Sequence, residues 1–351
     1  MNQLLLLFFI AICTLSNGQN NETSSLFSSK QIEVSFGNFK TIFRRLYRSL
    51  TTETDRLRIF GENLEYIESF NSRRDAFRTY TLGVNNFTDL SQDEFHRLYN
   101  GFIQRTQDPS SAAEERRAGR TLEVNVTEEM LRQRLPRTVD WSQRGVLTPV
   151  KQQGQCGSCW SFAAVAAIES QVAIHTGQLV SLSEQNLLDC AVYGNNGCAG
   201  GLMNNAYEYV IQNGGIDTAD SYPYLGAQRY CRFNTFSVGA QISSYVNLQR
   251  GSEAELMYAL AHSGPVSVGM DASRQSLQFY SSGVYDDPSC SSYNLNHGVV
   301  VVGYGTTTDG VDYFKVKNSW GQSWGMGGYF LIRRNAGNRC GIATQASYPV
   351  L

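Results

Sequence analysis

Two cysteines lie three positions apart in the stretch QCGSCW, as Cys156 and Cys159. This spacing could belong to a redox couple, to half of a zinc site, or to a disulfide end beside a nucleophilic thiol. A redox couple needs a βαβ context, and the preceding LTPVKQQGQ is a poor strand. A zinc site needs a second close pair, which the later cysteines do not provide. Purely structural cysteines with one leftover thiol are the fourth alternative.

The cysteine count favours the nucleophilic thiol. Of the eight cysteines, seven follow residue 134, and Cys13 lies in an apolar leader. In an exported chain, an odd number leaves an intermolecular bridge or a free thiol. Cys159 precedes the alanine-rich run SFAAVAAIESQVAIHTG, which predicts a helix that ends at Gly177. Because a helix N-terminus stabilises a thiolate, Cys159 is the candidate nucleophile.

A nucleophilic thiol needs a base, and three histidines are available after residue 134. His175 and His262 fall near helix ends, where a structural contact with the helix dipole is the simpler explanation. His297 precedes the run VVVVGYG and is expected at the start of a strand. A lone histidine there is more often structural, but Asn318 in KNSWGQSWG could orient its imidazole.

Trp320 and two hydrogen-bond donors complete the candidate site. Trp320 would shield the hydrogen bond between His297 and Asn318 from water. The developing oxyanion needs donors, and the Cys159 backbone N–H and the Gln153 side-chain amide are the candidates.

The leader indicates export. The apolar run Leu4–Leu15 is too short to span a membrane and is followed by a small-x-small pattern, which predicts a signal peptide over residues 1–18. An N-terminal anchor is the alternative. Export leads to an oxidising compartment where disulfides form. Three N-x-Thr glycosylation acceptors fit the same route: Asn21, Asn86 and Asn125.

The chain changes character near residue 134. Residues 1–134 hold 34 charged side chains, whereas the rest holds 26 charged residues and 26 of the 32 glycines. Phe36, Phe39, Phe43 and Tyr47 recur at helical spacing in the first part. A polar stretch after Phe102 with the dibasic pair Arg116–Arg117 predicts an exposed linker that proteases could cut. The net charge of −2 does not suggest a nucleic-acid or membrane-surface protein.

The second part predicts a helix followed by strands. HGVVVVGYG, DYFKVKNSW and GGYFLIRR are β-branched or aromatic runs bounded by glycines. This order indicates an α+β domain with segregated halves, and a cleft between such halves is a common place for a site.

These motifs together resemble the papain-like cysteine proteases, specifically the cathepsin L-like branch. PVKQQGQCGSCWSF, LSEQNLLDC, GCAGGLM, NHGVVVVGYG and NSWGQSWGMGGY occur in the family's order. The resemblance implies a two-lobed fold, with a helical lobe that carries the catalytic helix and a β-barrel-like lobe. It implies a peptidase over residues 135–351.

The first part resembles the cathepsin L-type propeptide. Its interrupted E-R-F-N-I-N pattern is matched except at the leading Glu, where Thr52 stands, and its G-x-N-x-F-x-D motif is intact. The matching residues are Arg56, Phe60, Asn63, Ile67 and Asn71, then Gly83, Asn85, Phe87 and Asp89. The resemblance implies an inhibitory helical propeptide over residues 19–134. Protonation of carboxylates such as Asp89 would then weaken its docking in acid.

The family's roles apply at the matching positions. Cys159 would attack the peptide carbonyl, His297 would form the ion pair with its thiolate, and Asn318 would orient His297. Gln153 and the Cys159 N–H would bind the oxyanion. The implied disulfides leave Cys159 unpaired: Cys156–Cys198, Cys190–Cys231 and Cys290–Cys340.

The resemblance also implies a substrate cleft that prefers an apolar residue at P2, the second position before the cut. Gly200 and Gly201 would pair with the substrate backbone, because glycine allows close approach. Gln345 would stand at the pocket's far end, where relatives often have a small apolar residue. The other residues implied to bind substrate are Leu202, Met203, Gly269, Leu295 and Trp320.

The expected protein is therefore a monomeric cysteine endopeptidase made as a zymogen, without metal or cofactor. Its expected partners are protein and peptide substrates, its own propeptide and cystatin-type inhibitors. Its expected location is the secretory pathway, ending in a lysosome or in an extracellular or digestive lumen. The competing class is a catalytically dead homologue that serves as a binding or storage protein.

Overall fold

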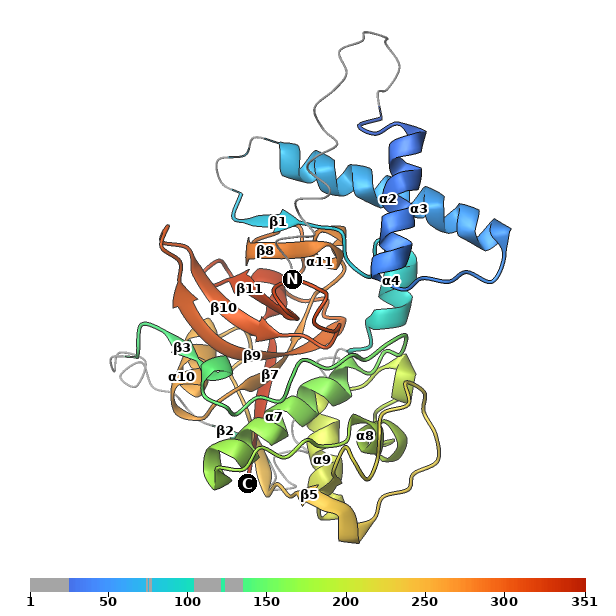
Figure 1. Ribbon diagram of the computed structural model, residues 1–351. Coiled ribbons are helices and arrows are strands. Elements are labelled where there is room, and N and C mark those ends of the chain that lie inside the picture. The colour runs from blue at the N-terminus through green and yellow to red at the C-terminus, as the bar shows by residue number, and fades with distance from the viewer. Residues whose placement is uncertain (1–24, 74, 76–77, 104–120, 124–134) are drawn as a thin grey trace. The chain divides into compact units, whose positions relative to one another are not determined.

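The computed structural model describes residues 25–73, 75, 78–103, 121–123 and 135–351 (Figure 1). They fall into two compact units. The first unit holds residues 25–73 and 86–91, and the second holds 75–85 and the described residues from 92 onward. The expected signal peptide, the dibasic pair and the acceptors Asn21 and Asn125 lie outside the described residues. Asn86 is described and half-buried.

The first unit is built on helices α2 (Ser29–Ile42) and α3 (Leu50–Ser72). Phe36 and Phe39 are buried against Phe60, with ring centroids 5.4 and 5.0 Å away. The helical spacing predicted Tyr47 on the same helix, and this was wrong. The helix ends because Arg44 takes a left-handed backbone conformation with φ of 52°.

Residues 86–91 are tied to α3 by side chains of the interrupted propeptide pattern. Asn63 is buried and donates to the carbonyl oxygens of Thr88 and Leu90, at 2.9 Å each. Arg56 donates to the Asp89 carbonyl oxygen at 2.9 Å. The hydroxyl of Tyr47, which lies after the end of α2, donates to the Asp89 carboxylate at 2.8 Å.

The second unit contains a large sheet with β9 (His297–Thr306) near its middle, between β10 (Asp312–Lys317) and β7 (Val266–Met270). The strand order is β1-β8-β11-β10-β9-β7-β12-β6-β2, and β3 pairs with β9. The remaining strands of this sheet are β1 (Tyr80–Leu82), β2 (Thr121–Glu123), β3 (Val139–Asp140), β6 (Ser244–Asn247), β8 (Tyr280–Tyr285), β11 (Tyr329–Arg333) and β12 (Gln345–Val350). β4 (Ile216–Asp217) and β5 (Val238–Ala240) form a separate pair.

Helix α7 (Cys159–Thr176) is buried along most of its length and ends at Gly177, whose φ is 73°. It packs on β9, while α8 (Glu184–Cys190) and α9 (Met203–Asn213) lie beside it (Figure 1). The predicted helix and the three predicted strands are confirmed. The other helices of the unit are α4 (Gln92–Tyr99), α10 (Glu253–His262) and α11 (Gln275–Gln278), with short 3-10 turns η1 (Trp141–Gln143), η2 (Gly197–Ala199), η3 (Thr235–Ser237) and η4 (Arg339–Gly341).

The compact units do not follow the expected boundary at residue 134. β1 pairs antiparallel with β8, and Asn85 donates to the Gln278 carbonyl oxygen at 2.7 Å. α4 contacts α11. These segments of the expected propeptide therefore belong to the same compact unit as residues 135–351.

Three disulfides link the pairs that the resemblance implies: Cys156–Cys198, Cys190–Cys231 and Cys290–Cys340. Cys159 is buried and unpaired with another cysteine. No described helix is both long and apolar enough to cross a membrane.

Candidate active site

Cys159 is the first residue of α7 and is fully buried. Ser158 precedes it without capping the helix, because its hydroxyl pairs with the Tyr224 hydroxyl at 2.6 Å. The first N–H groups of α7 consequently carry no side-chain cap and leave the positive end of the helix dipole at the thiol. The Gly298 N–H also donates to the Cys159 sulfur at 3.3 Å.

His297 begins β9, directly before Gly298, whose N–H reaches the Cys159 sulfur, so the start of the strand and the start of the helix lie together. Its Nε2 lies 2.9 Å from Asn318 Oδ1, which also accepts from the Ser319 N–H at 2.8 Å. Because Oδ1 is the acceptor, Nε2 carries the proton of the neutral ring. Nδ1 is buried without a hydrogen-bond partner and is left with a lone pair that can accept a proton.

Trp320 covers the imidazole, with ring centroids 4.5 Å apart and planes 27° from parallel. It is itself fully buried and meets Trp324 edge-on. An apolar cover of this kind keeps water from the hydrogen bond between His297 and Asn318.

Gln153 is buried with its amide fixed at both ends. Its Oε1 accepts from the Ser319 hydroxyl at 2.7 Å, so Nε2 is the end of the buried amide that is left to donate. That Nε2 donates to the Tyr99 and Cys156 carbonyl oxygens, at 2.9 Å each. A carbonyl oxygen of the expected propeptide therefore occupies the donor that an oxyanion would use.

Burial keeps both candidate catalytic groups neutral in this form. It raises the pKa of the Cys159 thiol to about 11, although backbone N–H groups, first that of Gly298 and then that of Gly101, favour the thiolate. It lowers the pKa of His297 to about 4, against the hydrogen bond to Asn318. Burial therefore disfavours the charged form of each group while the site is covered.

The cover is the segment Tyr99–Ile103. Gly201 donates its N–H to the Gly101 carbonyl at 2.9 Å and accepts from the Ile103 N–H at 3.1 Å, which makes a parallel bridge. The Gly101 N–H also faces the Cys159 sulfur, so the segment presents a hydrogen-bond donor to the thiol. Gly200, the other predicted backbone-binding glycine, also lies against Gly101.

Phe102 lies in the predicted substrate pocket. With Leu202, Met203 and Gln345 it lines a cavity of about 140 Å³. A Cβ built on Gly269 would lie 2.6 Å from the Phe102 ring and 3.2 Å from Leu295. The structure therefore brings together the five residues predicted for this pocket, which are Leu202, Met203, Gly269, Leu295 and Gln345. The Gln345 Oε1 is buried there without a hydrogen-bond partner.

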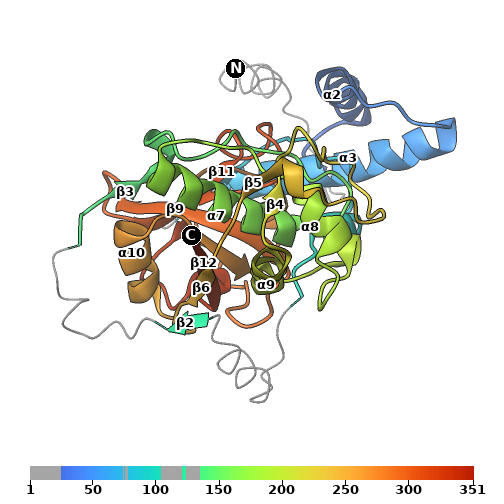
Figure 2. The same ribbon diagram turned by 90° about the horizontal axis from the view of Figure 1, so that it is seen from below.

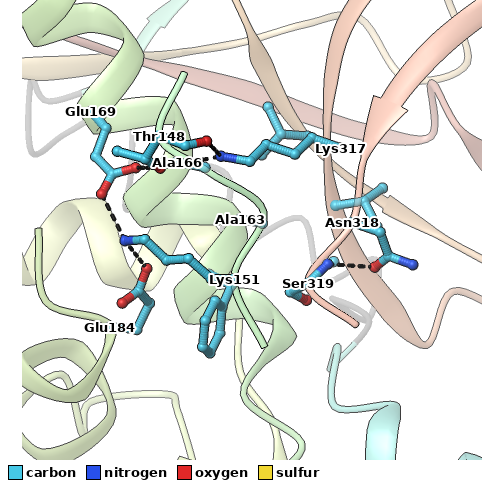
Figure 3. A pocket seen from close by; sticks show the side chains of 13 residues that line it. Thr148, Lys151, Ala163, Ala166, Glu169, Glu184, Lys317, Asn318 and Ser319 are labelled. Atoms are coloured by element: carbon cyan, nitrogen blue, oxygen red, sulfur yellow. Dashed lines mark hydrogen bonds and ion pairs between the residues drawn. The ribbon is translucent and has the colours of Figure 1, made fainter. Parts of the chain in front are cut away.

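Sequence reasoning missed a buried cluster of charges beside the site. Lys151 pairs with Glu169 of α7 at 2.8 Å and with Glu184 at 2.6 Å (Figure 3). The Lys317 ammonium donates to the Thr148 carbonyl at 2.7 Å, and the Thr148 hydroxyl donates to Glu169 at 2.7 Å. The cluster links the helix that begins at Cys159 to the strand that ends beside Asn318.

Burial shifts two of these groups toward their neutral forms. It raises the pKa of Glu184 to about 7 and lowers that of Lys317 to about 8. One available sequence signal was Glu169, a lone acid in an otherwise apolar helical run. The two histidines expected to be structural do contact helix ends, since His175 lies 2.9 Å from the Gln171 carbonyl and His262 lies 3.0 Å from that of Tyr258. No cluster of possible metal ligands occurs among the described residues.

A buried thiol at a helix start and an oriented imidazole on a facing strand are the arrangement of a cysteine peptidase. Two family models match the chain: the papain family cysteine protease over residues 135–350 and the cathepsin propeptide inhibitor domain (I29) over residues 36–95. The chain belongs to the papain family of cysteine proteases.

Individual relatives agree with this assignment. A cathepsin L-like peptidase of Aedes aegypti is 50% identical over 316 residues, covering 89% of this chain and 91% of that protein. The procathepsin L of Mus musculus is 41% identical and is matched over 100% of both chains. The structure of the digestive procathepsin L2 proteinase from Tenebrio molitor larval midgut superposes with a TM-score of 0.83 at 42% identity, covering 91% of this chain and 100% of that one.

The protein is thus a cathepsin L-like cysteine endopeptidase with a propeptide inhibitor domain, as an autoinhibited zymogen has. Nothing in these likenesses favours the dead homologue.

Proposed function

We propose that Cys159, His297, Asn318 and Gln153 carry out peptide-bond hydrolysis once the Tyr99–Ile103 segment has left. Departure of the segment lets water reach the site, so the thiol pKa falls and the imidazole pKa rises, and the proton moves from Cys159 to His297. The thiolate attacks the peptide carbonyl carbon and pushes its electron pair onto the oxygen, which accepts from Gln153 Nε2 and the Cys159 N–H.

The tetrahedral intermediate then expels the amine, which takes the proton from His297 and leaves a thioester. Water attacks the thioester with His297 as base, releasing the acid product and the thiol. Asn318 positions the ring throughout, because its Oδ1 holds Nε2–H and leaves Nδ1 toward the reaction. The observation that carries this proposal is the unpaired Cys159 thiol in contact with Gly298, directly after His297, whose ring is oriented by Asn318.

Titration with an epoxide inhibitor tests the assignment. We expect one equivalent to abolish hydrolysis by the processed enzyme and mass spectrometry to place the adduct on Cys159. Loss of activity without an adduct at Cys159 would refute the assignment, and a processed protein that neither reacts nor hydrolyses would restore the dead-homologue alternative.

The P2 pocket should accept Leu, Val or Phe, because the apolar side chains of Leu202 and Met203 line it, together with Phe102 of the covering segment. Gln345 adds a polar feature. A buried amide oxygen without a partner costs roughly 1–3 kcal/mol, and a donor on the substrate side chain could satisfy it.

We therefore expect Gln345→Ala to change the choice among P2 residues. The variant should favour Phe over Tyr by about tenfold more than the wild type does, since one hydrogen bond of about 1.4 kcal/mol corresponds to that ratio. Matched fluorogenic dipeptides that differ only at P2 measure kcat/KM for each. An unchanged Phe-to-Tyr ratio would contradict the role, and Thr344→Ala, a change in the same cavity, is the control.

The remaining assignments follow from the family. We propose a signal peptide over residues 1–18, a propeptide over 19–134 and a mature peptidase from about Leu135. The secretory pathway is supported by the relatives, and a lysosome or a digestive lumen is the proposed destination, the latter because relatives from Homarus americanus and Tenebrio molitor are called digestive. Cystatin-type inhibitors and a monomeric state are proposed on the same grounds.

A further inference from the structure

Strand β6 would be an edge of the peptidase sheet if residues 135–351 stood alone. On one side, β6 pairs antiparallel with β12, from Ser244 with Val350 to Asn247 with Ser347. On its other side the only pairing among the described strands is with β2, which precedes the peptidase domain (Figure 2). An open strand edge presents unpaired N–H and C=O groups that accept another extended segment.

The segment Thr121–Glu123 fills this edge in a defined register. Its three residues pair parallel with Tyr245, Val246 and Asn247. The pairing joins backbone atoms, so it depends on an extended segment and not on particular side chains. Asn247, the last residue of the register, also lines the cavity that holds Phe102. Two separate parts of the chain before residue 135 thus reach the same side of the peptidase.

We propose that the free edge of β6 is a further docking site of the propeptide, and that Thr121–Glu123 is its occupant in the zymogen. It is separate from the pairing of β1 with β8, from the contact of α4 with α11 and from the active site that Tyr99–Ile103 covers. Seventeen residues separate the two segments, from 104 to 120. Because both segments belong to one chain, each contact raises the effective concentration of the other segment and makes it rebind faster.

The contact at β6 affects how processing proceeds. A cut between the two segments, for example at Arg116–Arg117, separates the active-site segment from the mature chain but leaves Thr121–Glu123 on β6 and joined to the mature domain. Only a later cut near Leu135 would then open the β6 edge. The proposal predicts an intermediate that is active and still carries the β2 strand.

Hydrogen exchange on a Cys159→Ser zymogen tests the contact without relying on catalysis. We expect the peptide that covers Ser244–Asn247 to exchange more slowly in this zymogen than in the mature enzyme. Changing Thr121, Leu122 and Glu123 all to proline should remove that protection, because proline lacks the N–H. The control pair Leu122→Val and Glu123→Thr keeps strand-forming residues and should retain it.

The same proline changes in the zymogen with Cys159 intact should speed acid processing about tenfold, by loss of rebinding. Equal exchange of Ser244–Asn247 in zymogen and mature enzyme would overturn the proposal without touching the catalytic assignment. The wild-type comparison needs no variant, so it decides the matter even if the proline zymogen fails to fold. A processing rate that the proline changes leave unaltered would equally count against an inhibitory role.

Discussion

Zymogen carrying Gly101→Ala should react with a thiol-directed inhibitor at neutral pH at least about 100 times faster than the wild-type zymogen. A methyl group at this position would overlap the Gly157 carbonyl, and both partners are backbone, so neither can rotate away. The segment Tyr99–Ile103 would have to lift from the site.

Lifting Gly101 from the site removes its two backbone contacts at once. The Gly101 carbonyl loses the Gly201 N–H, and the Gly101 N–H leaves the Cys159 sulfur. A 100-fold change requires roughly 2.8 kcal/mol, of which two hydrogen bonds at about 1 kcal/mol each account for about 2 kcal/mol. The steric overlap with the Gly157 carbonyl has to supply the rest. Exposure of Cys159 and His297 also removes the burial that keeps them neutral, which raises the thiolate fraction further.

The measurement is the second-order rate of Cys159 alkylation in intact zymogen at pH 7, with gels that exclude processing during the assay. Gly37→Ala is the matched control, because a Cβ there meets no atom within 4 Å. If Gly101→Ala zymogen reacts no faster than Gly37→Ala zymogen, the segment is not what blocks the thiol.

The sequence predicted the elements of the active site because their signals are local. An alanine-rich run of helical length and a β-branched run between glycines place Cys159 at a helix start and His297 at a strand start. The odd cysteine count indicates one leftover thiol, and the predicted helix start and the disulfides that the family resemblance implies identify it as Cys159.

The blocked state of the site was not predictable from those signals. The contacts that impose it join Gly101 to Gly157 and Phe102 to Gly269, far apart in the chain, and no local pattern encodes such pairings. The expectation of a lowered thiol pKa was correct about the helix N-terminus but omitted burial, which is a tertiary effect and the larger one here.

The acid response expected at Asp89 is not supported by its surroundings. Burial raises the pKa of Asp89, against the charge of Arg45 and the Tyr47 hydrogen bond. A carboxyl whose pKa is raised on folding contributes stability at low pH and loses it as the pH rises through that raised pKa. By this sign, protonation of Asp89 in acid does not weaken the first unit, and an acid response requires a group whose pKa is lowered on docking.

His96 on α4 has the properties such a group needs. Its Nε2 is buried without a hydrogen-bond partner, and its imidazole bonds to the backbone of Ser273, whose carbonyl also accepts from the Gln92 amide at 2.7 Å. Burial lowers its pKa below 6.5. The nearby charges partly cancel, since Asp271 and Asp93 raise the pKa and Arg274 lowers it.

Protonation of His96 in acid weakens docking, whereas protonation of Asp89 does not weaken the first unit. A histidine whose pKa is lowered on docking binds a proton more tightly in the released state than in the docked state. Its contribution to the stability of docking is therefore complete above pH 6.5. That contribution is lost as the pH falls from 6.5 to the lower pKa of the docked ring. At pH 5.5 a released imidazole with an ordinary pKa of 6.5 favours opening by up to about tenfold.

We therefore expect His96→Gln to slow zymogen processing at pH 5.5 by up to about tenfold while leaving the rate at pH 7 nearly unchanged. Glutamine keeps a polar side chain but cannot take a proton, so the rise in rate between pH 7 and 5 should flatten. Initial processing rates with a trace of mature enzyme, taken from pH 7 to 4, give the profile. His262→Gln removes an exposed histidine of α10 and is the control. A His96→Gln profile with the wild-type shape, whatever its absolute rate, would show that α4 docking does not sense acid through this imidazole.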